Sequence, residues 1–210
     1  MATYGDIKTR VAGNLVRTDL GTEIGQAIND AINEYASTRF WFNETRSVTF
    51  NTVQGQQFYG TSDSSSIPYF VSIEQLILTD NGQRYQILRV TNDELERADQ
   101  PSTAQGRPYL YAYFNKQIRL WPPPPATVYS IRVTGYLTLA ELTDDTQTNV
   151  FTENAANLIR LSALRRVYSE IIRDDASAQT MLLAEQAALE RLNVETAQRN
   201  QYDDFSVQDF

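Results

Sequence analysis

Residues 107–136, RPYLYAYFNKQIRLWPPPPATVYSIRVTGY, and residues 152–173, TENAANLIRLSALRRVYSEIIR, decide the fold of this chain. Aromatic and aliphatic residues alternate through much of the first segment, and a period of two predicts β-strands. The second segment is apolar on more than one face, which predicts a buried central helix. Two short strands, a proline spacer and a third strand thus precede a long helix. That order favours an α+β fold over an all-α or all-β domain.

The first segment also predicts how its strands connect. Asn115-Lys116 can turn a tyrosine-rich strand back into a second strand that ends at Trp121. The run Pro122–Pro125 cannot donate ladder hydrogen bonds and favours extended polyproline geometry, so the second strand stops there. Strand alternation resumes at Tyr129.

Two further hairpins are predicted upstream of this segment. Gln54-Gly55-Gln56 separates strand-like residues 46–53 from Phe58-Tyr59, which predicts a hairpin between these two runs. Asn81-Gly82 lies between two longer apolar runs and readily adopts a type I′ turn, which predicts a second hairpin. The predicted β region extends to Leu139.

Apolar residues recur with helical spacing at both ends of the chain. Residues 7–15 and 24–35 predict two helices, and the short turn between them favours an antiparallel helical hairpin. Thr152 can cap the central helix, and the last helix is expected from Ala176 to Gln198. Inside the β region, Thr91-Asn92-Asp93-Glu94 has the spacing of a capping box and predicts a short helix.

The economical fold is a helical bundle of two N-terminal and two C-terminal helices, with an antiparallel β domain inserted between its halves. The expected divisions are the N-terminal helical hairpin at 1–43, the β domain at 44–140, the C-terminal helices at 141–199 and an extended C-terminal arm at 200–210.

The chain contains neither cysteine nor histidine. Disulfides, thiolate metal sites and serine-histidine triads are therefore excluded, together with ordinary zinc sites. Phosphate-binding glycine motifs are absent as well. We predict no catalytic residue, no cofactor and no metal, although a glycosidase acting through two distant carboxylates stays open.

Paired aspartates occur at Asp144-Asp145, Asp174-Asp175 and Asp203-Asp204. Each pair falls at a predicted boundary or in the tail, where aspartate commonly caps a helix or stabilises a turn. We interpret them as solvated caps. The spacing after Asp144 resembles a calcium loop only loosely, because Asn149 and Ala155 replace the glycine and glutamate that such a loop requires.

The formal charge is -8, from 26 acidic and 18 basic residues. That balance opposes non-specific adsorption to nucleic acid or to an anionic membrane. The first residues lack the basic and apolar regions of a secretory signal, and no apolar run approaches the ~20 residues of a membrane span. A protein kept in a soluble compartment is expected.

The last eleven residues differ in character from the helices before them. Four apolar residues, Tyr202, Phe205, Val207 and Phe210, stand among polar ones without helical periodicity. The segment is either a mobile terminus or an arm that orders on a partner, where separated aromatics fill pockets.

Several local strings, in this order, resemble the head-to-tail adaptor proteins of tailed bacteriophages, also called connector or head-completion proteins. They are Asn33-Glu34-Tyr35 at the end of the helical pair, Gln54-Gly55-Gln56, Arg107-Pro108-Tyr109, the strand Ile118–Pro122 that leads on to Tyr136, and the closing helices. The resemblance covers nearly the whole chain, and its motifs are structural rather than catalytic.

The resemblance implies a structural virion protein of the phage neck that is made in the host cytoplasm. Such proteins form a homo-oligomeric ring, usually dodecameric, that binds beneath the portal protein and presents a surface to tail or nozzle proteins. The helical bundle builds the ring, and a C-terminal extension reaches along the portal. Here Tyr202, Phe205, Val207 and Phe210 would anchor that extension.

Genomic DNA would pass through this ring without specific binding, because an acidic lumen repels phosphate and avoids friction. Arg160, Arg165, Arg166 and Arg173 lie on a helix too apolar for a free surface. We expect some of them to pair with acidic groups of neighbouring subunits, the alternative being solvated charges along one edge.

Two other functions remain open. One is a tail-side neck, nozzle or fibre-attachment protein. The other is a carbohydrate-binding module that would use Tyr109, Tyr111, Tyr113 and Trp121.

Overall fold

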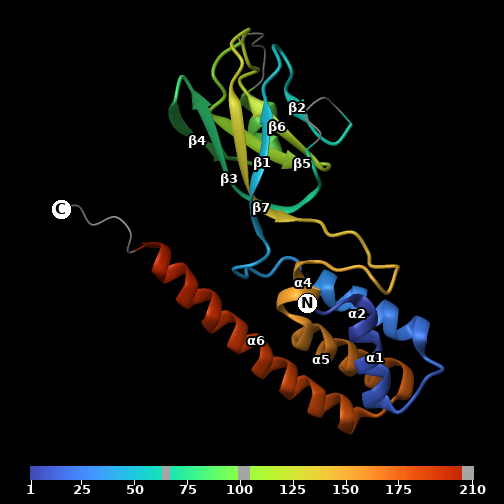
Figure 1. The fold of residues 1–210 in the computed structure, drawn as a ribbon. Helices are drawn as coiled ribbons and strands as arrows, with labels where there is room; N and C mark the ends of the chain where they lie inside the picture. The colour runs from blue at the N-terminus through green and yellow to red at the C-terminus, as the bar shows by residue number, and fades with distance from the viewer. Residues whose placement is uncertain (63–66, 99–104, 205–210) are drawn as a thin grey trace. The chain divides into compact units, whose positions relative to one another are not determined.

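The computed structural model describes residues 1–62, 67–98 and 105–204, with the backbone alone for 200–204. The chain divides into two compact units, Met1–Asn43 with Leu139–Phe210 and Glu44–Thr138. We call the first the helical unit and the second the sheet unit (Figure 1). The predicted mixed α+β class is confirmed.

The helical unit has its helices at both ends of the sequence. They are α1 (Tyr4–Leu15), α2 (Gly21–Tyr35), α4 (Val150–Asn154), α5 (Ala156–Arg166), the π-helix η1 (Val167–Ile172) and α6 (Asp175–Asp204). Helix α5 contacts α1, α2 and α6 and supplies buried aliphatic side chains to the shared core. The two N-terminal helices lie where their apolar spacing predicts them.

The central helix predicted from Thr152 to Arg173 consists of three segments rather than one. Its N-cap is Asn149, whose Oδ1 accepts hydrogen bonds from the backbone N–H groups of Phe151 and Thr152 at 3.0 Å each. The predicted cap was wrong because Thr152 occupies the third helical position, where its hydroxyl completes a capping box with Asn149. The backbone takes π geometry from Val167 and leaves the helix at Arg173, which has a φ of 59°.

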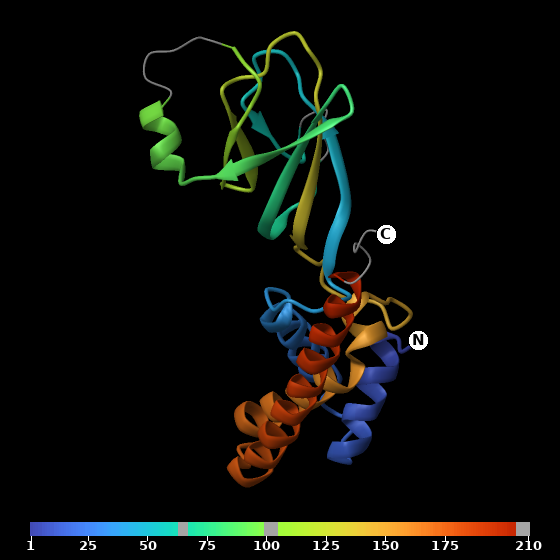
Figure 2. The same ribbon diagram turned by 90° about the vertical axis from the view of Figure 1, so that its left-hand side faces the viewer.

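The sheet unit contains seven strands and one short helix, α3 (Asn92–Ala98), among its described residues. The strands are β1 (Glu44–Asn51), β2 (Phe58–Tyr59), β3 (Phe70–Asp80), β4 (Gln83–Arg89), β5 (Leu110–Phe114), β6 (Gln117–Trp121) and β7 (Ser130–Leu137). Their order is β1-β7-β3-β4-β5-β6-β2. The sheet curls until its edge strands approach each other, with the ring centroids of Phe50 and Tyr59 5.0 Å apart (Figure 2).

Two predicted strand pairings were wrong. No hairpin forms across Gln54-Gly55-Gln56, because β1 pairs with β7 while β2 pairs with β6 at the other edge. The turn at Gly55 instead donates a backbone hydrogen bond to Pro124 O at 2.9 Å. The domain is also not wholly antiparallel, since β4 and β5 run parallel. The crossover through α3 makes that possible, because it returns the chain to the start of the next strand.

Three local predictions are confirmed. Asn81 and Gly82 have φ values of 48° and 84°, as a type I′ turn between β3 and β4 requires. Asn115-Lys116 forms the equivalent two-residue turn between β5 and β6. The capping box before α3 is formed by reciprocal hydrogen bonds between Thr91 and Glu94.

The proline segment interrupts the sheet as predicted, and the protein uses its carbonyl groups. Pro123 O accepts a hydrogen bond from Gly106 N at 2.9 Å, and Pro124 O accepts one from Gly55 N. Both prolines are buried. The segment is therefore packed against two loops of the sheet unit.

Candidate functional site

The acidic pairs at element boundaries act as turns and caps. Asp144 accepts hydrogen bonds from the backbone and hydroxyl of Thr146, and both bonds lower the pKa of Asp144. Asp174 accepts equivalent bonds from Ser177 at the start of α6, and its pKa is lowered for the same reason. In the part of the chain that the structure describes, no three Asp or Glu side chains group to hold a metal ion.

None of the helices within residues 1–62, 67–98 and 105–204 combines the length and hydropathy of a membrane span.

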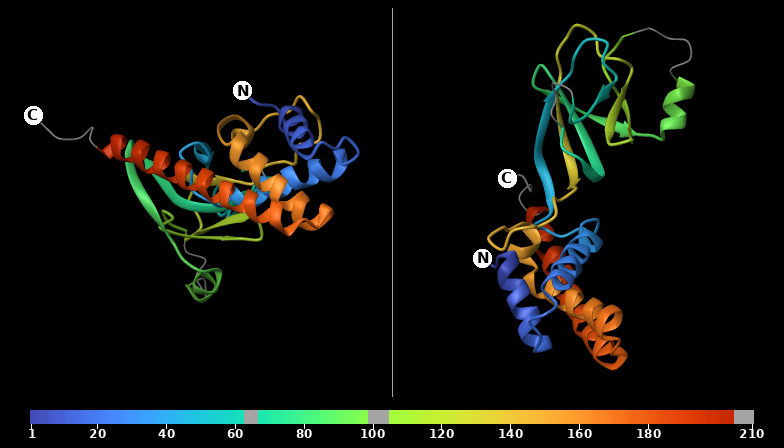
Figure 3. Two further views of the ribbon diagram at one scale, coloured as in Figure 1. Left: turned by 90° about the horizontal axis from the view of Figure 1, so that it is seen from below. Right: turned by 90° about the vertical axis from the view of Figure 1, so that its right-hand side faces the viewer.

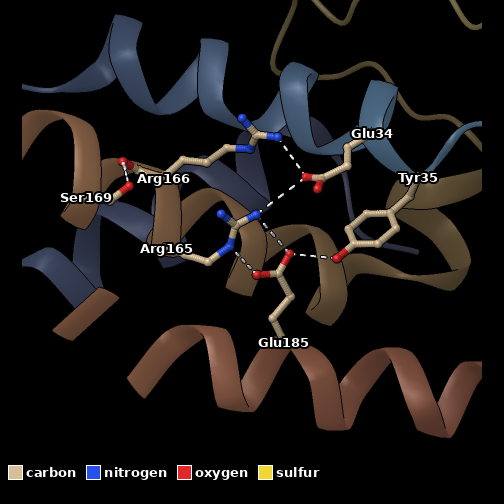
Figure 4. A network of polar contacts seen from close by, with 6 residues as sticks. All are labelled: Glu34, Tyr35, Arg165, Arg166, Ser169 and Glu185. Atoms are coloured by element: carbon tan, nitrogen blue, oxygen red, sulfur yellow. Dashed lines mark hydrogen bonds and ion pairs between the residues drawn. The ribbon is translucent and has the colours of Figure 1, made fainter. Parts of the chain in front are cut away.

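A network of ion pairs joins α2, α5 and α6 inside the helical unit (Figure 4). At its centre the carboxylate of Glu185 accepts a hydrogen bond from Tyr35 Oη at 2.6 Å and another from Arg165 Nε at 2.5 Å. Glu34 Oε2 accepts a hydrogen bond from Arg166 Nη2 at 2.7 Å and lies 3.5 Å from Arg165 Nη2. The Glu185 side chain is only 4% exposed, so the three helices are joined through a buried carboxylate.

The network holds Glu185 in its charged form. Burial raises the pKa of this carboxyl, but hydrogen bonds from Arg165 and Tyr35 outweigh burial, and the pKa is lowered. Burial and the hydrogen bond to Glu185 raise the pKa of Tyr35. The hydrogen bond to Glu185 is also the main reason that the pKa of Arg165 is raised. A neutral tyrosine and a charged pair therefore persist together across the neutral pH range.

The four arginines predicted at a subunit interface have different surroundings. Arg165 and Arg166 find acidic partners within the chain, on α2 and α6. Arg160 donates hydrogen bonds to Asn14 and Asn157 at 3.2 and 2.9 Å. Arg173, which follows the π-helix, is exposed. Intrachain pairing thus accounts for two of these charges on an apolar helix.

The sequence also contains a pattern that indicates a buried position for Glu185, although acidic residues are usually exposed. Glu185 lies in helical phase with Met181, Ala188 and Leu192, all of which pack towards the core of the helical unit. A carboxylate in an apolar stripe requires a buried cation or hydroxyl. Arg165 and Tyr35 supply these groups from α5 and α2.

The predicted portal arm coincides only partly with the described residues. Helix α6 continues to Asp204, so residues 200–204, expected to be extended, are helical. Tyr202 belongs to that helical stretch, whereas Phe205, Val207 and Phe210 lie outside the described residues. The wrong boundary has a simple cause, since the polar residues of the stretch break the apolar periodicity but not the helix.

Helix α6 is fixed near its end by an aromatic contact. The guanidinium of Arg199 lies 3.7 Å from the ring centroid of Trp41. The backbone N–H of Trp41 reaches Thr196 Oγ1 at 3.4 Å. The two neighbouring phenylalanines turn the other way, with Phe40 fully in the core and stacked on Phe42 at 5.2 Å. The turns of α6 around Thr196 and Arg199 are thus tied to the segment after α2.

The aromatic residues suggested for sugar binding do not form a common surface. Tyr111 is 1% exposed and belongs to the core of the sheet unit. The hydroxyl of Tyr113 is engaged with the backbone of Phe70. Tyr109 stands half-exposed with its ring edge-on to Trp121, at a centroid distance of 5.3 Å. This arrangement is a packing cluster rather than a flat platform for a sugar ring.

The chain is similar to a known protein family. A family model described as SU10 adaptor protein matches residues 2–207 and therefore includes residues of both units. The search of curated proteins gives no match to the chain.

Proposed function

This chain belongs to the SU10 adaptor protein family, and from that membership we propose that it forms a homo-oligomeric ring beneath the portal of a tailed bacteriophage. Family membership makes it a structural phage adaptor and a virion component that interacts with portal and tail proteins. The proposed location is the neck of the virion, reached after synthesis and assembly in the host cytoplasm. The observation that carries the proposal is the extent of the match, residues 2–207.

In the proposed ring, the helical unit supplies the bundle that contacts neighbouring copies, and the number of copies is twelve by the resemblance. The buried network around Glu185 supports this role, because it fixes α2, α5 and α6 as one rigid body. Arg173 and Arg160 are the better candidates for contacts with acidic groups of a neighbour. Arg165 and Arg166 already have acidic partners in their own chain.

We further propose that residues 200–210 bind the portal, with Tyr202, Phe205, Val207 and Phe210 as apolar anchors. A variant truncated after Arg199 keeps the contacts of α6 with Trp41, and its helical unit should unfold at the same urea concentration as the full chain. Portal binding should be lost. Undiminished binding to the portal ring by the truncated chain would refute the arm.

The proposed lumen of the ring conducts genomic DNA without binding it. A formal charge of -8 supports this, because a net negative wall repels phosphate and releases no counterions on contact. Retention of the assembled ring by a DNA column at low salt would contradict a repulsive lumen.

The decisive experiment measures the mass of the protein alone and with its portal ring, by light scattering and by electron microscopy of the complex. An adaptor should be monomeric or loosely associated alone and should become a ring on the portal. Binding to tail or nozzle proteins in the absence of any portal binding would favour the alternative, a tail-side neck, nozzle or fibre-attachment protein.

A further inference from the structure

Helix α6 has apolar residues on two opposite faces. One face packs on α5, and the other carries Leu183 and Val194, which are 60% and 51% exposed. Ala187 and Glu190 lie between them on the same side of the helix, because residues three, four, seven and eleven apart share one face. We call these four residues the outer face of α6. Leu183 and Val194 are therefore apolar side chains of α6 that are available to a partner.

A groove of about 540 Å³ lies along α1 on another side of the helical unit. Its lining includes the small residues Thr9, Ala12 and Gly13, the cations Lys8 and Arg17, and Asp145, which pairs with Lys8 at 2.8 Å. Figure 3 shows α1 and α6 on different sides of the helical unit, and α5 packs against both of them. Two different surfaces on different sides of one rigid unit are what a head-to-tail contact between copies requires.

Two residues of the groove have side chains that are unusual for their backbone positions. A Cβ atom at Gly13 would meet nothing within 4 Å, although glycine inside a helix is less stable than alanine. Val16 ends α1 with a φ of 53° and is 89% exposed, although a branched residue rarely takes this left-handed conformation. The missing side chain at position 13 leaves room for another backbone, and Val16 offers it an apolar contact. Both residues are explained by an external helix seated in the groove.

We propose that the outer face of α6 of one copy docks into the α1 groove of the next copy. Glu190 on the outer face of α6 would pair with one of the two groove cations, Lys8 or Arg17, which lie nine positions apart in the sequence. The present partners of these two cations, Asp145 and Asp19, are 65% and 60% exposed, so exchanging them costs little. This inference rests on the proposed ring and names the surfaces that close it.

Disulfide cross-linking tests the contact directly, because the chain contains no cysteine. Mixing the full-length Val16→Cys and Leu183→Cys proteins under mild oxidation, with and without the portal ring, should give covalent heterodimers on the ring. The double variant should give a ladder of oligomers, and neither single variant should cross-link with itself. A mixture of Val16→Cys with Val128→Cys is the matched control, because Val128 is 65% exposed but belongs to the sheet unit.

The proposal is overturned if the Val16 and Leu183 mixture cross-links no better than the control, or if a single variant dimerises with itself. A second pair of variants, each combined with Val16→Cys, tests whether the groove itself is the docking site. Gly13→Trp fills the groove from open space and should abolish cross-linking to Leu183→Cys, whereas Gly13→Ala should retain it. Undiminished cross-linking with Gly13→Trp also overturns the proposal.

Portal binding separates the failure of this inference from the failure of the proposed function. If the chain forms rings on its portal but the cysteine pair does not cross-link, the groove contact is wrong and the adaptor function stands. If the ladder forms but the protein never binds a portal, the contact stands and the function is wrong.

Discussion

Replacing Glu185 by glutamine should destabilise the helical unit without altering its shape. The substitution keeps the size of the side chain and leaves an acceptor for the hydroxyl of Tyr35, which lies 2.6 Å from Glu185 Oε1. It removes the negative charge that faces Arg165. The arginine then keeps Glu34 as its acidic neighbour, at 3.5 Å.

The expected loss follows from how far each partner is buried. Breaking a buried ion pair by removing one charge typically costs about 3–5 kcal/mol. Here Glu185 is 4% exposed but Arg165 is 25% exposed and retains a second acid, so water and Glu34 offset part of the loss. We therefore expect about 2–3 kcal/mol for Glu185→Gln. Tyr35→Phe removes one hydrogen bond to the same carboxylate and should cost about 1–2 kcal/mol.

Urea unfolding followed by tryptophan fluorescence measures this difference. The chain has two tryptophans, Trp41 in the helical unit and Trp121 in the sheet unit. A Trp121→Phe background leaves Trp41 as the reporter, which separates the unfolding of the helical unit from that of the other unit. A free energy of unfolding for Glu185→Gln within about 0.5 kcal/mol of the parent would refute the buried-charge reasoning.

The same carboxylate gives this comparison a pH dependence. The pKa of Glu185 is lowered in the folded chain, so its stabilisation is fully present above the ordinary pKa of 4.5 and is lost as pH falls through the folded value. The difference in stability between the parent and Glu185→Gln should therefore be constant near neutral pH and shrink below pH 4.5. A difference that grows on acidification would contradict the assigned charge.

Three further substitutions probe other parts of the chain by urea titration, with Trp121 as the reporter for the sheet unit and Trp41 as the reporter for the helical unit. Gly135→Ala should destabilise the sheet unit by about 3 kcal/mol, because the added Cβ would lie 2.4 Å from Ser72 O in the adjacent strand; an unchanged midpoint would contradict that packing. Asn149→Ala should cost about 1 kcal/mol through loss of the cap of α4, whereas the predicted cap Thr152 would show the larger effect if Asn149 were not the cap. Gly13→Ala should raise the stability of the isolated chain by up to about 1 kcal/mol, and a destabilised variant would mean that the site is not open.

Local chemistry made the turns predictable. Asn81-Gly82 and Asn115-Lys116 need positive φ at both residues, a demand that these sequences meet whatever the rest of the fold does. The capping box of Thr91 and Glu94 is equally local. Periodicity likewise revealed α1 and α2, because the buried stripe of each helix is continuous.

Pairings between distant strands were not accessible in this way. Whether Phe58-Tyr59 joins β1 or β6 depends on how the whole sheet curls, and the two residues have the same strand propensity in either case. The parallel pairing of β4 with β5 likewise depends on the crossover through α3. Among the interaction residues, the arginines were visible as charges on an apolar helix. Their partners Glu34 and Glu185 were not, because they lie 131 and 20 positions from Arg165 in the sequence.

The buried network also determines which surface α6 offers to a partner. Successive residues of a helix turn by about 100°, so Leu183 and Glu185 point roughly 200° apart. Once Arg165 and Tyr35 hold Glu185 inside the unit, Leu183 must face outwards, and Val194 follows three turns later. A rotation of α6 that exposed Glu185 would leave its ion pair with Arg165 half-solvated. The same rotation would turn the outer face of α6 away from the solvent. The ion pairs between α2, α5 and α6 therefore link the stability of a single copy to the surface that we propose contacts the next copy.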